Sequence, residues 1–82
     1  MAEEEEYDER RQLLEAALGE LPEREREIIR ARKLQEDPST LEELSGRFGI
    51  SRERVRQIEV HAFERLQEKM KAALTAKRSL IN

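Results

Sequence analysis

Two helical segments joined by a turn of three residues are the feature that most constrains this chain. The first segment opens with a capping-box pattern, in which Thr40 can accept from an early amide and Glu43 can reach back. It closes at Gly49, because glycine readily takes the left-handed conformation that ends a helix. Ser51 is then a suitable N-cap for the next helix. We therefore predict a helix-turn-helix within residues 40–66.

The apolar residues of both segments are spaced for packing against each other. In the second segment, a turn of 100° per residue places Val55, Ile58, Ala62 and Leu66 on one stripe. The predicted core of the helix-turn-helix comprises Leu44, Phe48, Gly49, Ile50, Val55, Ile58 and Ala62.

Polar residues occupy the other side of the second segment. Its first two turns carry Arg52, Glu53, Arg56 and Gln57, where a recognition helix meets base edges in the major groove. Arginine can bond to guanine, glutamine to adenine, and glutamate can accept from the cytosine amino group. Arg54, on a flank, is better placed for phosphate.

A simpler interpretation treats these polar residues as an ordinary solvated face. Exposed helix faces are commonly charged, and neighbouring Glu and Arg can simply pair with each other. The capped helix and the glycine turn upstream favour DNA reading over this alternative.

The remaining segments also predict helices. One runs from about Tyr7 to Leu18 and another from Leu21 to about Leu34, before a loop at Pro38. The last helix is expected to reach about Lys69. We expect an all-α fold, a small bundle of about four helices containing a C-terminal helix-turn-helix. Its parts are an acidic extension over 1–12, the domain over 13–70, and a loose tail over 71–82.

The composition excludes several function classes. The 82 residues include no Cys and one His, which leaves no thiol chemistry and no predicted metal site or cofactor. No nucleophile is paired with a base, so we do not expect an enzyme. No apolar run approaches the roughly 20 residues that span a bilayer, so we expect a cytoplasmic protein without a membrane partner.

The net charge of −3 hides a gradient along the chain. Residues 1–27 hold 11 acids and 4 bases, a net of −7, whereas residues 51–82 hold 4 acids and 8 bases, a net of +4. A basic C-terminal third can present a local positive face to nucleic acid.

Two stretches of this sequence resemble region 4 of bacterial RNA polymerase sigma factors. They are Thr40 to Leu44 and the string Ser-Arg-Glu-Arg-Val-Arg-Gln-Ile-Glu over residues 51–59. The stretch Leu21 to Glu27 resembles the first half of that domain. The version here, followed by residues 60–64, is most similar to heat-shock-type sigma factors. This resemblance implies a role in transcription initiation and recognition of the −35 promoter element.

The resemblance also assigns roles to individual residues. It implies base contacts by Arg52, Glu53, Arg56 and Gln57. It implies contacts to the DNA backbone by Arg24, Arg32, Leu41, Ser51, Arg54 and His61. His61 stands where housekeeping members usually have Lys, which serves DNA or activator contacts. Glu64 stands where those members tend to have Arg, so we expect activator contacts there to be lost.

Protein partners follow from the same resemblance. The family domain docks on the flap of the polymerase β subunit, and apolar positions of the first two helices are candidates for that contact. An anti-sigma factor or an activator is a further expected partner. Since a complete sigma factor needs another domain for the −10 element, we expect this chain to be one domain of a longer protein, monomeric in isolation.

Two other functions remain open. A free-standing helix-turn-helix repressor normally dimerises to read paired half-sites. A protein-interaction module, such as a sigma mimic that captures an anti-sigma factor, would not need Arg52 and Gln57.

Overall fold

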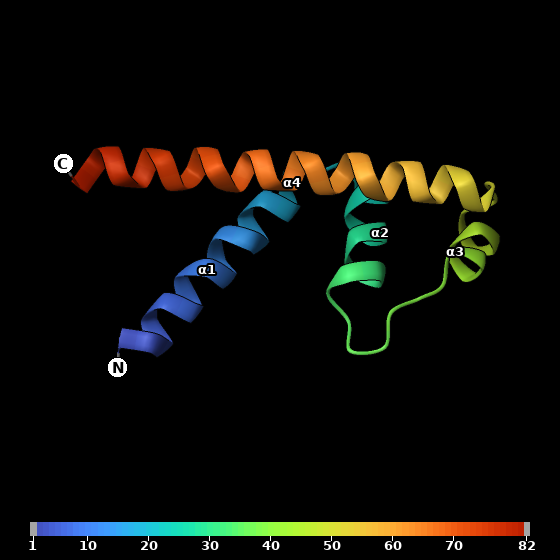
Figure 1. The fold of residues 1–82 in the computed structure, drawn as a ribbon, viewed down its shortest axis with the longest axis horizontal. Coiled ribbons are helices and arrows are strands. Elements are labelled where there is room, and N and C mark those ends of the chain that lie inside the picture. Colours follow the sequence, from blue (N-terminus) through green and yellow to red (C-terminus); the bar gives the residue numbers. More distant parts are fainter. Residues whose placement is uncertain (1, 82) are drawn as a thin grey trace.

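The computed structural model describes the backbone of residues 2–81 and the side chains of residues 8–76. It contains four helices: α1 (Ala2–Gly19), α2 (Glu23–Lys33), α3 (Leu41–Phe48) and α4 (Arg52–Ile81). The three shorter helices each pack against α4, and all lie on one side of it (Figure 1). The prediction of an all-α fold with about four helices is confirmed.

The ends of α2 follow from its local sequence. Pro22 precedes the first residue, and Glu23 and Glu25 lie in the first turn. Arg30, Arg32 and Lys33 lie in the last turn. Acids at the N-terminus and bases at the C-terminus both stabilise the helix through its macrodipole.

Both ends of α3 carry the predicted caps. The Thr40 side chain accepts from the Glu43 amide at 3.0 Å, and its hydroxyl donates to Glu43 Oε1 at 3.2 Å. Gly49 closes the helix with φ of 67°, and the Ile50 amide donates to the Ser45 carbonyl at 3.2 Å. These bonds satisfy backbone groups that a helix end leaves free.

The turn into α4 is held by two serines. The Ser45 hydroxyl donates to the Ile50 carbonyl, which ties α3 to the turn. Ser51 Oγ accepts from the Arg54 amide at 3.0 Å, as expected of an N-cap. The direction of α4 relative to α3 is therefore set by short local bonds.

The buried core forms two clusters along α4. One, beneath the helix-turn-helix, contains Leu44, Val55 and Ile58 together with Ile28 and Ala31 of α2; the partly buried Leu41, Phe48 and Ile50 pack on it. The other, beneath α1, contains Ala17, Leu18, Leu21, Ile29, Ala62 and Leu66. Ala62 was predicted in the helix-turn-helix core, but it packs in the α1 cluster. Helix α2 contributes to both clusters and joins them.

The helical segments extend beyond their predicted bounds. Helix α1 begins at Ala2 rather than near Tyr7, and α4 continues to Ile81 rather than ending near Lys69. The backbone of 71–81 is thus helical where a loose tail was expected. Residues 52–81 contain no Gly or Pro to stop the helix. Met70 also packs on the α1 cluster, and Lys69 Nζ lies 3.3 Å from Glu20 Oε2. The division of the chain into three parts stays a prediction.

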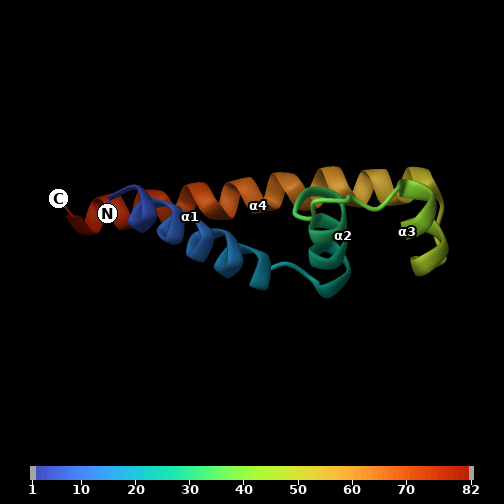
Figure 2. The same ribbon diagram turned by 90° about the horizontal axis from the view of Figure 1, so that it is seen from below.

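The molecule is long and thin, with extents of 47 × 24 × 15 Å. Turned by 90°, it shows both termini at one end and α3 at the other (Figure 2). Among the helices of the described chain, none combines the length and apolar character needed to cross a bilayer.

Candidate nucleic-acid interface

The first two turns of α4 present a polar ridge to solvent. Arg52, Glu53, Arg56 and Gln57 are all exposed, whereas Val55 and Ile58 on the other side of the helix are buried against α2 and α3. Because the apolar side is covered, the four predicted base-contact residues point together away from the body of the protein. We call these four residues the reading ridge.

Two members of the reading ridge form a fork-shaped ion pair. Arg56 Nη2 lies 2.6 Å from Glu53 Oε1, and Arg56 Nε donates to Oε2 at 3.0 Å. The hydrogen bond from Arg56 lowers the pKa of Glu53 from its ordinary value of 4.5, and the same bond raises the pKa of Arg56. Both side chains are therefore charged at neutral pH. Of the five N–H donors of a guanidinium, Arg56 keeps three for another partner.

The other two members of the reading ridge are uncommitted. Within the described residues, neither Arg52 nor Gln57 takes part in a side-chain hydrogen bond or ion pair. Their donors and acceptors are open to a ligand.

The predicted backbone-contact residues divide between the two sides of the reading ridge. Arg24, Arg54 and His61 line one hollow, where the first turn of α2 meets α4. Arg32 and Leu41 line another, on the side where Val60 and Phe63 of α4 lie. Ser51 is at the N-cap between them, where its Oγ is occupied by the Arg54 amide. We call the first set the Arg24 flank and the second the Arg32 flank.

Arg32 is anchored by a buried carboxylate. Its Nε donates to Glu59 Oε2 at 3.0 Å, and its Nη1 donates to the Ser39 carbonyl at 2.9 Å. Glu59 is 8% exposed and also has Lys33 Nζ at 3.7 Å. The ion pair joins α2 to α4, and the bond to Ser39 adds the loop before α3. The Arg32 guanidinium thus sits beside the reading ridge in a fixed orientation.

Glu59 was not predicted to have this structural role. Its position beside the buried stripe of α4, one residue after Ile58, is a sequence signal that it faces the interior. The partner, however, lies 27 residues away, so the pair is visible only in the folded chain.

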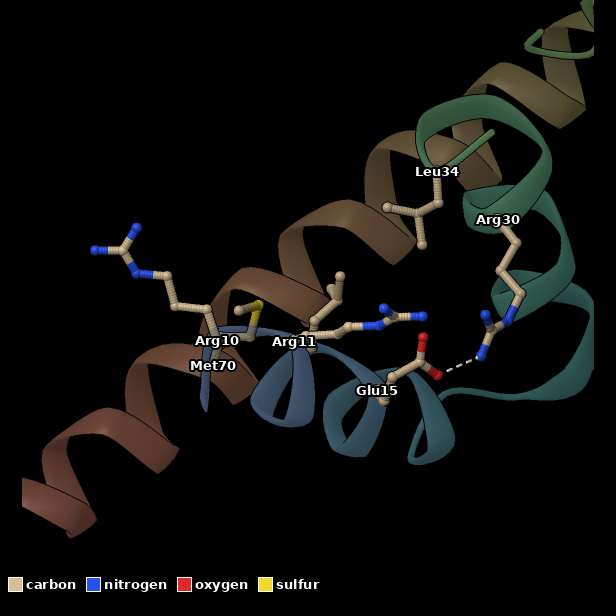
Figure 3. A pocket seen from close by; sticks show the side chains of 7 residues that line it. Arg10, Arg11, Glu15, Arg30, Leu34 and Met70 are labelled. Atoms are coloured by element: carbon tan, nitrogen blue, oxygen red, sulfur yellow. Dashed lines mark hydrogen bonds and ion pairs between the residues drawn. The ribbon is translucent and has the colours of Figure 1, made fainter. Parts of the chain in front are cut away.

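A third, separate hollow lies between α1, α2 and α4. Its volume is about 670 Å³, and its apolar lining consists of Leu14, Leu34 and Met70. Arg10, Arg11, Glu15 and Arg30 complete the wall (Figure 3). The dashed line in the figure joins Arg30 Nη2 to Glu15 Oε2 at 2.8 Å, a bond that lowers the pKa of Glu15. We call this the Leu14 hollow.

Metal binding has no support in the described residues. Among them, no three His, Asp or Glu side chains gather as a metal site would require. The arrangement offers instead a polar ridge between two partly basic flanks, which suits a polyanion with readable edges.

The sequence is similar to those of known proteins. The family model described as Sigma-70, region 4 matches residues 17–68. RNA polymerase sigma factor RpoH of Caulobacter vibrioides is 57% identical over 77 residues, covering 94% of this chain and 26% of that protein. RpoH of Rhizobium radiobacter is 58% identical over 81 residues, covering 98% of this chain and 27% of that protein. RNA polymerase sigma-B factor of Myxococcus xanthus is 46% identical over 59 residues, covering 72% of this chain and 24% of that protein. The chain thus spans about a quarter of the length of these relatives.

Proposed function

The chain belongs to the sigma-70 region 4 family, close to the heat-shock-type sigma factors, and from this membership we propose that it reads the −35 promoter element in the major groove. It would do so as part of a sigma factor bound to RNA polymerase in the cytoplasm, at the initiation of transcription.

The observation that carries this proposal is the exposure of all four ridge residues on a helix whose other side is buried. Arg52 and Gln57 have free donors for base edges, and Arg56 keeps three N–H groups beyond its bond to Glu53. Glu53, held ionised by Arg56, can accept from a cytosine amino group. The ridge therefore offers both donors and acceptors for direct readout.

The two flanks support the same proposal. The major groove is bordered by a phosphate backbone on each side, and phosphate contacts set the register of a recognition helix. The Arg24 flank and the Arg32 flank lie on opposite sides of the reading ridge. We propose that Arg24, Arg54 and His61 contact the phosphate backbone of one DNA strand. Arg32 and Leu41, at the start of α3, would contact the phosphate backbone of the other strand. Ser51 would lie at the edge of the groove.

Binding to a −35 duplex and to a scrambled duplex tests this function. We expect Arg52→Ala to weaken binding to the −35 duplex by about 1–3 kcal/mol and to leave binding to the scrambled duplex nearly unchanged. Arg11→Ala, which removes the same charge from α1, is the control and should have no such effect. Equal affinity of the unmodified chain for both duplexes would contradict −35 recognition.

We propose further that the Leu14 hollow receives the flap of the polymerase β subunit. Its apolar lining of Leu14, Leu34 and Met70 suits an apolar segment of a partner. Met70 lies about 20 Å along α4 from Gln57, at 1.5 Å per residue, so polymerase and DNA can be held together.

Leu34→Asp tests the docking site without touching the core, since Leu34 is 42% exposed. We expect this variant to bind a β-flap fragment more weakly, on the order of tenfold, and to bind −35 DNA normally. Leu74→Asp is the matched control, because Leu74 is 40% exposed and does not line the hollow. Unchanged flap binding by Leu34→Asp would contradict the proposed site.

A further inference from the structure

Val60 is an exposed apolar side chain on the same face of α4 as the reading ridge, one turn before the exposed Phe63. Val60 is 45% exposed, and it lies within about 20° of Glu53 around the helix at 100° per residue. Its neighbours on this face are Arg56, Gln57, Phe63 and Glu64, all exposed. Single apolar side chains are common on protein surfaces, so exposure by itself assigns Val60 no role. Its methyl groups are nevertheless accessible for a contact outside the chain.

We propose that Val60 is a specificity-determining residue that contacts the C5-methyl group of a thymine in the promoter element. This inference rests on the proposed major-groove binding. In that groove, thymine is the base that presents a methyl group, and an apolar side chain recognises it by contact. Val60 would thus add an apolar contact to the hydrogen bonds of the reading ridge.

The spacing along α4 places Val60 in series with the reading ridge. Glu53, Arg56, Gln57 and Val60 follow the pattern i, i+3, i+4, i+7. Homeodomains read bases from four positions of one helix with this same spacing. Val60 is three residues beyond Gln57, a rise of about 4.5 Å, which is near the 3.4 Å step between base pairs. Val60 therefore reaches a base pair next to those of the ridge.

The surroundings of Val60 favour DNA over a protein partner. The hollow that Val60 lines carries three cationic side chains, Arg32, Lys33 and Arg56, and two acidic ones, Glu59 and Glu64, so cations outnumber acids there. Phe63, 38% exposed, lines the same hollow and is the nearby alternative, but Lys33 Nζ lies 5.4 Å from its ring centroid, so its ring already has a cationic partner. A protein surface on Val60 would have to cover the Glu53–Arg56 ion pair, whereas the major groove offers polar partners to that pair and a methyl to Val60.

Replacing each thymine of the −35 duplex in turn by deoxyuridine removes the methyl group alone. For the unmodified chain, we expect one of these duplexes to bind about fourfold more weakly, the loss that corresponds to one buried methyl group. Val60→Ala should bind the thymine duplex more weakly by a similar factor and should be insensitive to deoxyuridine at that position. Alanine suits an exposed helix position, so this variant should fold.

Leu74→Ala, which removes another exposed apolar side chain of α4, is the control and should keep the deoxyuridine response. If no deoxyuridine substitution weakens binding, although the unmodified chain still binds −35 DNA more tightly than scrambled DNA, the Val60 contact is overturned and the proposed function stands. The Val60 contact is likewise overturned if Val60→Ala responds to deoxyuridine like the unmodified chain, or if it weakens only β-flap binding. If the unmodified chain binds −35 and scrambled DNA equally well, both the Val60 contact and the proposed function are overturned.

Discussion

At the scale of single residues, Glu59 has the most consequential position. Its buried carboxylate lies between the cations of Arg32 and Lys33 and links α4 to α2. Through Arg32 it also reaches the Ser39 carbonyl in the loop that precedes α3. A buried charge of this kind is tolerated because its partners remain in place.

Glu59→Gln should therefore lower the free energy of unfolding by about 1–3 kcal/mol, because a neutral amide leaves the two cations without a counter-charge. Urea denaturation at neutral pH measures the change. Glu64→Gln, on the exposed side of the same helix, is the control and should change stability little. Equal stability of Glu59→Gln and the unmodified chain would show that the ion pair is not structural.

The Glu53–Arg56 pair predicts a pH dependence. Since Arg56 lowers the pKa of Glu53 from 4.5, any stability from the pair is present above about pH 4.5 and is lost as pH falls through the lowered pKa. In Arg56→Ala, the titration midpoint of Glu53 should rise, which carboxyl-detected NMR can follow. The Glu15 midpoint, lowered by Arg30, should stay unchanged as an internal reference. An unmoved Glu53 midpoint would contradict the pairing.

At the scale of elements, the turn between α3 and α4 sets the direction of the recognition helix. Gly49 adopts a left-handed conformation there, with φ of 67°. Apart from its two chain neighbours, no residue has an atom within 4 Å of the place where a Cβ would be, so only the backbone conformation opposes a side chain. Gly46, inside α3, likewise leaves room for a Cβ, but its φ is not positive.

Replacing each of these two glycines by alanine should change the stability of the domain in opposite directions. Gly49→Ala should destabilise the domain by about 1–2 kcal/mol, because an L-residue is strained in the left-handed region. Gly46→Ala should stabilise it by about 0.5–1 kcal/mol through helix propensity. Thermal or urea unfolding of both variants measures the difference, and effects of the same sign would contradict this account of the turn.

At the scale of the whole molecule, both termini lie at the end of the long axis opposite the helix-turn-helix (Figure 2). The acidic N-terminal segment of α1 lies at the end of the molecule opposite α3 and the start of α4 (Figures 1 and 2). Around the reading ridge, residues 40–59 hold four acids and four bases, so attraction to DNA there depends on where the individual arginines point and not on the net charge.

Affinity for −35 DNA should fall steeply with salt, because phosphate contacts release counterions. Arg54→Ala should reduce the slope of log K against log salt by about 1, if Arg54 contacts one phosphate. Fluorescence anisotropy across a KCl series measures both slopes, and Arg11→Ala should keep the original one. A salt-independent affinity would argue against backbone contacts by the flanks.

The sequence alone determined the features whose signals are local. Thr40, Gly49 and Ser51 marked the helix-turn-helix, because each cap acts on backbone groups within five residues of it. The 100° periodicity likewise placed Val55 and Ile58 inside and Arg52 and Gln57 outside.

Only the tertiary structure decided which distant residues meet. It assigned Ala62 to the cluster under α1, paired Glu59 with Arg32, and brought Arg24 beside Arg54 and His61. Such contacts depend on where each helix crosses α4, and the crossing is set by how all the buried side chains pack at once. A linear pattern carries the periodicity of each helix but not the point at which two helices touch.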